Sequence, residues 1–262
     1  MRAKNATSTF TPNKQYSGMS LALAASATLR GWQETLMTES TVDDRYYEAV
    51  SKSGISERLL IWARDRIYTD FQRFCAPRDE DQLLDVGVSD VIAPGANLLE
   101  RLYPHPERIT AVGLGAGGDF RATHPQVTYR RIVANEPLPF ADGAFAVAAS
   151  NAVLEHVGSP AAQRAFVAEM ARVARKAFIT VPHRFFPVEP HTNIPLLHYT
   201  DATFAFACRA MGKSEWAAQE NLILMNRDRL RSLVPPGCNA SIGATGLPLG
   251  PFSSNLYLFI ER

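Results

Sequence analysis

The sequence predicts an α/β domain whose mostly parallel sheet is covered by helices on both faces. From residue 82 onward, short apolar runs rich in branched residues alternate with segments of helical periodicity. Strands that alternate with helices imply right-handed crossovers and therefore parallel pairing. The 262 residues are 46% hydrophobic and 20% charged, a composition typical of one soluble globular domain. We expect a helical extension or lid over residues 1–80 and the α/β domain over residues 81–262, with an insertion at about 184–220.

Each predicted strand is a short apolar run bounded by glycine, proline or polar residues. The runs cover residues 82–88, 108–115, 143–153, 176–182, 239–246 and 254–261. Only a link rich in proline and glycine separates the last two runs, so we expect them to pair antiparallel at one edge of the sheet.

The predicted helices show apolar residues at helical spacing together with recognisable end signals. They cover residues 56–74, 97–103, 159–175 and 226–234. The third begins with Ser159 at its N-cap and proline at the next position, and it ends in basic residues, as helix termini favour.

Charge and cysteine content exclude several classes of protein. Lys and Arg total 27 against 26 Asp and Glu, so a net charge of +1 gives no general attraction to nucleic acid. The cysteines Cys75, Cys208 and Cys238 form no CxxC pair, which favours a reducing, cytoplasmic compartment. No apolar run reaches the roughly 18 residues of a membrane-spanning helix.

Several stretches resemble the class I S-adenosylmethionine-dependent methyltransferases, specifically the small-molecule group called type 11. They are LLDVGV (83–88), EPLPFADGAF (136–145), SNAVLEHVGS (150–159) and the region 166–192. The resemblance implies a Rossmann-like seven-stranded sheet with an antiparallel last strand. It also implies S-adenosylmethionine as cofactor and a small molecule as methyl acceptor.

The resemblance assigns cofactor contacts to loops that follow the strands. Asp85 and Gly87 match the acid and first glycine after the first strand, where glycine lets the backbone approach the cofactor. Asn135 replaces the acid that usually lies beside the adenine. The full set of expected cofactor-binding residues is Asp85, Gly87, Val88, Gly113, Leu114, Gly115, Asn135, Ser150, Asn151 and His156.

The sequence also departs from the family pattern. The stretch VSDVIAPGAN replaces a glycine-rich turn, and Gly115 stands where an acid usually binds the ribose hydroxyls, with Asp119 the nearest acid. Loss of a charged hydrogen bond costs about 1.5 to 3 kcal/mol, which weakens binding without abolishing it. Two functions therefore stay open: methyl transfer to a small molecule, and a catalytically degenerate, methyltransferase-like binding or regulatory subunit.

The stretch GLGAGG at 113–118 also satisfies the GxGxxG pattern of dinucleotide-binding proteins. A pyrophosphate site needs a following helix of some length, but His124 and Pro125 interrupt this one after barely two turns. The sequence therefore disfavours a nicotinamide or flavin enzyme.

The segment from Pro182 to Tyr199 follows the predicted run 176–182 and concentrates histidine, glutamate and aromatic residues. One interpretation is an acceptor pocket in which His183 or His191 is the catalytic base, needed if the acceptor atom is oxygen but not if it is nitrogen or carbon. Another is a structural loop. The spacing matches neither HExxH nor a zinc pattern, so we expect no metal site.

The N-terminal helices carry the aromatic residues Trp32, Tyr46, Tyr47, Trp62 and Tyr68. They fit a lid over the cofactor cleft, a cover for one face of the sheet, or a homodimer interface. The sequence does not separate these alternatives.

Overall fold

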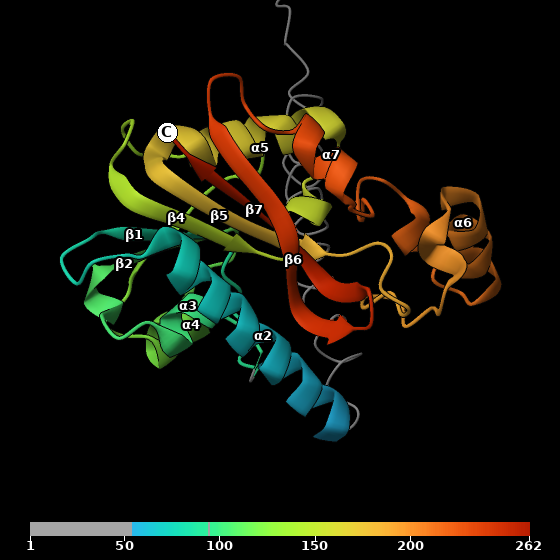
Figure 1. Ribbon diagram of the computed structural model, residues 1–262. Coiled ribbons are helices and arrows are strands. Elements are labelled where there is room, and N and C mark those ends of the chain that lie inside the picture. Colours follow the sequence, from blue (N-terminus) through green and yellow to red (C-terminus); the bar gives the residue numbers. More distant parts are fainter. Residues whose placement is uncertain (1–53, 94) are drawn as a thin grey trace, which may run out of the picture. The chain divides into compact units, whose positions relative to one another are not determined.

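The computed structural model describes residues 54–93 and 95–262, all within one compact unit. These residues form a seven-stranded sheet in the order β3-β2-β1-β4-β5-β7-β6, with helices on both faces (Figure 1). This confirms the predicted Rossmann-like α/β architecture. Of the N-terminal aromatic residues, Trp32, Tyr46 and Tyr47 lie outside the described residues.

The first five strands are parallel, and the last two are antiparallel to their neighbours, as predicted. The strands are β1 (Leu83–Val86), β2 (Ile109–Gly113), β3 (Thr128–Arg131), β4 (Phe145–Asn151), β5 (Ala174–Pro182), β6 (Asn239–Leu249) and β7 (Phe252–Glu261). Strand β7 pairs with both β5 and β6, so β6 forms one edge of the sheet.

Strand β3 is the one strand of this sheet that the sequence did not predict. Its residues TYRR carry long polar side chains that stay exposed or half-buried, so no apolar run marks it. The strand forms through parallel backbone pairing with β2, from Thr110 opposite Thr128 to Gly113 opposite Arg131. Tyr129 also packs its ring against Phe120, at 5.2 Å between centroids.

Two apolar layers hold the helices to the sheet. Helices α2, α3 and α4 pack on one face around Phe71, Leu99 and Phe120, whereas α5 and α7 pack on the other around Met170 and Leu230. The α-helices are α2 (Gly54–Cys75), α3 (Leu98–Leu102), α4 (Gly118–Thr123), α5 (Pro160–Val173), α6 (Asp201–Ala210) and α7 (Arg227–Ser232). No helix in the described part of the chain is long and apolar enough to cross a membrane.

The predicted start of α5 is confirmed in detail. The Ser159 hydroxyl accepts a hydrogen bond from the Ala162 N–H at 3.1 Å, which satisfies one of the unpaired donors of the first turn. The expected insertion at 184–220 contains the unpredicted helix α6, which is capped by Thr200 and lies beyond the carboxyl end of β5 (Figure 1).

The order of the strands indicates at which edge of the sheet a ligand is expected to bind. From β1 the chain continues outward to β2 and β3, then returns to β4 and continues to β5 on the other side. Ligands of open α/β sheets bind beyond the carboxyl ends of the strands at this reversal. The loops after β1, β2, β4 and β5 are therefore the ones to inspect.

Candidate functional site

A cavity lies at this reversal, between the ends of β1 and β4 and helix α2. Its volume is about 300 Å³, including space open to solvent. Asp85, Ser150, Asn151 and Thr180 supply its polar wall. Its apolar wall includes Ile67, Tyr68, Phe71, Leu98, Leu99 and Phe178. We call it the switch-point cavity. It brings together three of the expected cofactor-binding residues, and the α2 residue Tyr68 joins them.

Asp85 forms a buried pair of carboxyl groups with Glu100 of α3. Only 7% of Asp85 and 6% of Glu100 is exposed. Burial raises the pKa of Asp85 to about 7, and burial together with the neighbouring Asp85 raises the pKa of Glu100 well above its usual value. Two adjacent buried carboxyl groups resist simultaneous ionisation, so the pair retains a proton near neutral pH.

The turn after β1 requires glycine at position 87. Gly87 has φ of 96°, and a Cβ atom there would lie 2.3 Å from Cγ2 of Val153. The Gly87 and Val88 N–H groups both donate to the Val112 carbonyl, at 2.8 and 3.1 Å. Gly113 lies close by, because a Cβ on it would approach the Val88 carbonyl oxygen to 2.6 Å. The structure therefore brings Gly87, Val88 and Gly113 together at the expected edge.

Asp90, which was not predicted as a site residue, lies in the loop after β1 and extends its carboxylate to the backbone that follows β2. The Asp90 carboxylate accepts hydrogen bonds from the Gly117 N–H at 2.8 Å and the Phe120 N–H at 3.3 Å. A Cβ atom on Gly115 would be 2.9 Å from Asp90 Oδ2. Gly115 stands where the family usually has an acid. Asp90 thus places a carboxylate beside that position. Asp119, the nearest acid in sequence, lies on the exposed side of the first turn of α4.

Of the other expected cofactor residues, some lie at the wall of the switch-point cavity and some lie away from it. The Ser150 hydroxyl donates to the Val86 carbonyl at 2.8 Å, and Asn151 Oδ1 accepts from the Thr180 hydroxyl at 2.6 Å, so both are fixed at the cavity wall. Leu114 follows β2, where its carbonyl accepts from Arg131 Nε at 2.8 Å. Asn135 is exposed in the turn after β3, and it does not line the switch-point cavity.

A second hollow, which we call the insertion pocket, lies where the insertion meets the end of β5. It has a volume of about 250 Å³, including space open to solvent, and both His183 and His191 line it. His183 Nδ1 donates to the Ser253 carbonyl at 3.2 Å, and partial burial lowers the pKa of its imidazole. The edge of its ring meets Phe185 at 5.8 Å between centroids.

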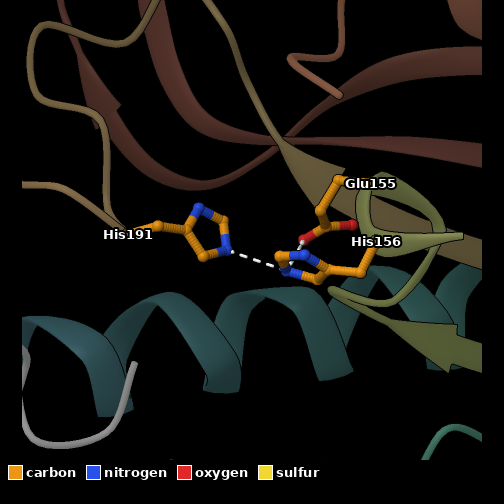
Figure 2. Close-up of side chains that lie close together, drawn as sticks. All are labelled: Glu155, His156 and His191. Carbon is orange, nitrogen blue, oxygen red and sulfur yellow. Dashed lines mark hydrogen bonds and ion pairs between the residues drawn. The ribbon is translucent and has the colours of Figure 1, made fainter. Parts of the chain in front are cut away.

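Glu155, His156 and His191 come together (Figure 2), and Glu155 and His191 also line this pocket. The Nε2 atoms of the two histidines are 3.1 Å apart, and Glu155 Oε1 is 3.9 Å from His156 Nε2. One ligand atom from each residue lies within 4.8 Å of the others. The structure therefore places His156 beside His191 and not among the residues that line the switch-point cavity.

Both imidazoles are oriented by bonds on their other nitrogen. His156 Nδ1 bonds the Asn221 carbonyl at 2.6 Å, and His191 Nδ1 bonds Glu189 Oε1 at 2.6 Å. Burial lowers the pKa of His156 to about 3. Burial acts to raise the pKa of Glu189, but His191 and the Thr192 hydroxyl hold it at about 2, so Glu189 is ionised.

Part of the chain is similar to a known protein family. Residues 95–178 match the family model described as "Methyltransferase domain". Together with the seven-stranded sheet and its antiparallel last strands, this match confirms the resemblance on which the sequence analysis relied. The described residues have the class I methyltransferase fold, residues 95–178 are similar to a methyltransferase domain, and S-adenosylmethionine is the cofactor that this similarity indicates.

Solved structures share this fold at low sequence identity. A magnesium protoporphyrin IX methyltransferase from Synechocystis with bound S-adenosylhomocysteine has a TM-score of 0.55 at 11% identity, and the alignment covers 85% of this chain and 94% of that one. A methyltransferase from Methanosarcina mazei gives 0.51 at 12% identity, covering 74% and 97%. One from Mesorhizobium loti gives 0.50 at 13% identity, covering 75% and 98%. No curated protein matches the sequence significantly.

Proposed function

We propose that this protein transfers the methyl group of S-adenosylmethionine to a small-molecule acceptor. The observation that carries the proposal is the placement of two acids around the turn at Gly87. Asp85 lines the switch-point cavity from β1, and the Asp90 carboxylate lies against the backbone that follows β2. A carboxylate has about four lone-pair sites, so Asp90 can accept further hydrogen bonds beyond those from the α4 backbone.

These residues fit the cofactor, and each has a distinct task. Asp90 would accept hydrogen bonds from the ribose hydroxyls in place of the acid missing at Gly115. Gly87, whose positive φ shapes the turn after β1 against Val153, would hold the backbone that faces the methionine end. Asp85, Ser150 and Asn151 would supply polar partners within the switch-point cavity, while Tyr68 and Phe71 exclude water.

S-adenosylmethionine supplies an already activated methyl group, so positioning and exclusion of water can provide most of the acceleration. The insertion pocket adjoins the switch-point cavity along β5, where Thr180 lines one and Pro182 the other. We assign it to the acceptor. Its aromatic neighbours fit a partly apolar molecule.

For a hydroxyl acceptor, His183 is the better of the two expected bases. Its Nδ1 donates to a carbonyl, which leaves Nε2 as the proton-accepting atom, and its lowered pKa keeps it neutral at physiological pH. His191 is buried, and its Nε2 faces His156. An acceptor nitrogen or carbon would need neither.

Calorimetric titration of the full chain with S-adenosylhomocysteine tests the proposal. We expect binding, and we expect Asp90→Asn to weaken it about 10- to 100-fold, the equivalent of one charged hydrogen bond. Asp119→Asn is the matched control, because that acid lies nearby but is exposed, and we expect it to bind like the wild type. Absence of binding at millimolar ligand would refute the proposal and favour the degenerate binding subunit, which the missing glycine-rich pattern after Gly87 suggests. Equal affinity of Asp90→Asn and Asp119→Asn would remove Asp90 from the site.

A further inference from the structure

We propose that Glu155, His156 and His191 bind one divalent transition-metal ion, with the remaining coordination positions open toward the insertion pocket. Two imidazole nitrogens and one carboxylate form a ligand set found in zinc enzymes and in non-haem iron sites. The expectation of no metal site rested on spacing within one segment of the sequence. These ligand atoms come from two segments, one after β4 and one in the insertion.

His156 and His191 face each other through their Nε2 atoms. His156 Nδ1 must carry the hydrogen, because its partner is a carbonyl oxygen, which only accepts. His191 Nδ1 likewise donates to the Glu189 carboxylate, at 2.6 Å from Oε1. The two Nε2 atoms then face each other across 3.1 Å, so either a shared proton or a metal ion lies between them. Without one of these, the two lone pairs would repel at that distance.

The distance itself suits a shared metal ion. With Zn–N bonds of about 2.0 to 2.1 Å and tetrahedral angles, two nitrogen ligands of one ion lie about 3.3 Å apart. The observed 3.1 Å is close to this separation. Glu155 Oε1, at 3.9 Å from His156 Nε2, reaches the same ion by a small rotation of its side chain.

The carboxylate of Glu155 is buried beside these two histidines. The residue is 1% exposed, and neither of its side-chain oxygens has a hydrogen-bond partner among the described residues. A buried carboxylate without such partners is costly, and coordination of a cation removes the cost. Arg64 of α2 supplies a positive charge in the vicinity, but its Nε and Nη1 atoms make no hydrogen bond in the described part of the chain.

The surroundings have the features of a built metal site. Metal-binding histidines usually donate their other N–H to a carboxylate or a backbone carbonyl, as His191 does to Glu189 and His156 does to Asn221. Glu189 is itself fixed by the Thr192 N–H at 2.7 Å. The Trp216 ring covers His191 at 5.2 Å between centroids, which shields the site from water on that side.

The test is metal binding by the untagged full chain, and it needs no catalytic assay. After treatment with a chelator, the protein is titrated with Zn²⁺ by calorimetry, and bound zinc is counted by mass spectrometry. We expect one tight site in the wild type. Glu155→Gln and His191→Gln should lose at least about 100-fold in affinity, and Glu189→Gln about 10- to 100-fold, since it only orients His191.

His105→Ala is the matched control for adventitious binding. His105 lies on the surface between Asp79 and Glu107, at 3.3 and 3.7 Å, and is the alternative place where zinc would attach through a histidine and carboxylates. We expect its tight site to be unchanged. Co²⁺ added to wild type should also produce the visible absorption of a four-coordinate site, and this readout needs no variant to fold.

Two results would overturn the inference. One is an absence of tight Zn²⁺ binding, because zinc binds nitrogen and oxygen sites more tightly than manganese or ferrous iron does. The other is tight binding that Glu155→Gln and His191→Gln leave intact. In either case the two histidines share a proton in place of a metal ion. Because Zn²⁺ is measured without S-adenosylmethionine, failure here does not touch the proposed methyl transfer.

Discussion

At the scale of single residues, the ligand-binding edge of the sheet concentrates buried acids. Asp85 and Glu100 lie side by side, and burial raises the pKa of Glu155 to about 7 as well. A buried acid that cannot ionise freely costs stability, which a fold tolerates chiefly where a ligand or a proton is to be held. The acids of this edge are therefore better explained by function than by packing.

The Asp85 and Glu100 pair makes stability depend on pH. Both pKa values are higher in the folded chain than in the unfolded chain, so the folded state binds more protons between about pH 4 and pH 7. The free energy of unfolding therefore falls as pH rises through this window. Glu100→Gln removes one acid and lets Asp85 ionise alone. We compare the free energy of unfolding of this variant with that of wild type at each pH. We expect this difference to favour the variant more at pH 8 than at pH 5, by roughly 1 kcal/mol or more.

Urea denaturation of both proteins at the two pH values measures this difference. Glu136→Gln is the control, because Glu136 is exposed and its neutralisation should leave the pH dependence as in wild type. Parallel pH profiles for Glu100→Gln and wild type would show that the two carboxyl groups do not share a proton.

The sequence showed the residues of the strand ends but not which of them meet. Asp85, Ser150 and Asn151 were predictable, because each ends a buried apolar run. His156 and His191 are 35 positions apart, and only the parallel pairing of β4 with β5 brings the following loops together. Asp90 was not predicted because its loop lacks the family's glycine pattern. The sequence therefore did not show that the Asp90 carboxylate reaches the backbone after β2.

At the scale of elements, burial decided what could be predicted. Strands β1, β4 and β5 are buried on both faces and read as apolar runs, whereas β3 is polar and forms only because β2 offers it a backbone partner. Helix α6 was missed because proline and aromatic residues around it read as a loop. Its cap at Thr200, confirmed by the bond from the Thr203 N–H at 3.2 Å, was the available signal.

One element contact explains the LPFADGAF motif that carried the resemblance. Arg172 of α5 donates to the Leu138 and Phe140 carbonyls at 3.0 and 2.8 Å and to Glu169 and Asp142, so its guanidinium fastens the loop before β4 onto the helix. We expect Arg172→Lys to destabilise the fold by about 1 to 2 kcal/mol, because a lysine ammonium cannot span these acceptors.

Hydrogen exchange locates this effect, and urea denaturation gives its size. The amides of residues 134–144 should exchange faster in Arg172→Lys, while those of β5 should not change. Arg164→Lys, an exposed position of the same helix, is the control and should match the wild type in both measurements. Protection of the loop equal to wild type would mean that its own turns hold it.

At the scale of the whole molecule, two sites share one edge of the sheet but use different groups. Asp85, Ser150 and Asn151 line the switch-point cavity, for which we propose Asp90 as a further cofactor contact, whereas Glu155 and His191 line the insertion pocket. At a hundred times its dissociation constant, S-adenosylhomocysteine adds about 2.7 kcal/mol to the free energy of unfolding. For a chain of this size that raises Tm by roughly 5 to 10 °C.

Because the sites share no side chain, we expect Glu155→Gln to keep this shift while losing zinc, and Asp90→Asn to keep zinc while losing most of the shift at the same ligand concentration. NAD should give no shift with any of the three proteins. Loss of both ligands in either variant, with the fold intact by circular dichroism, would show that the metal and the cofactor occupy one coupled site and not two neighbouring ones.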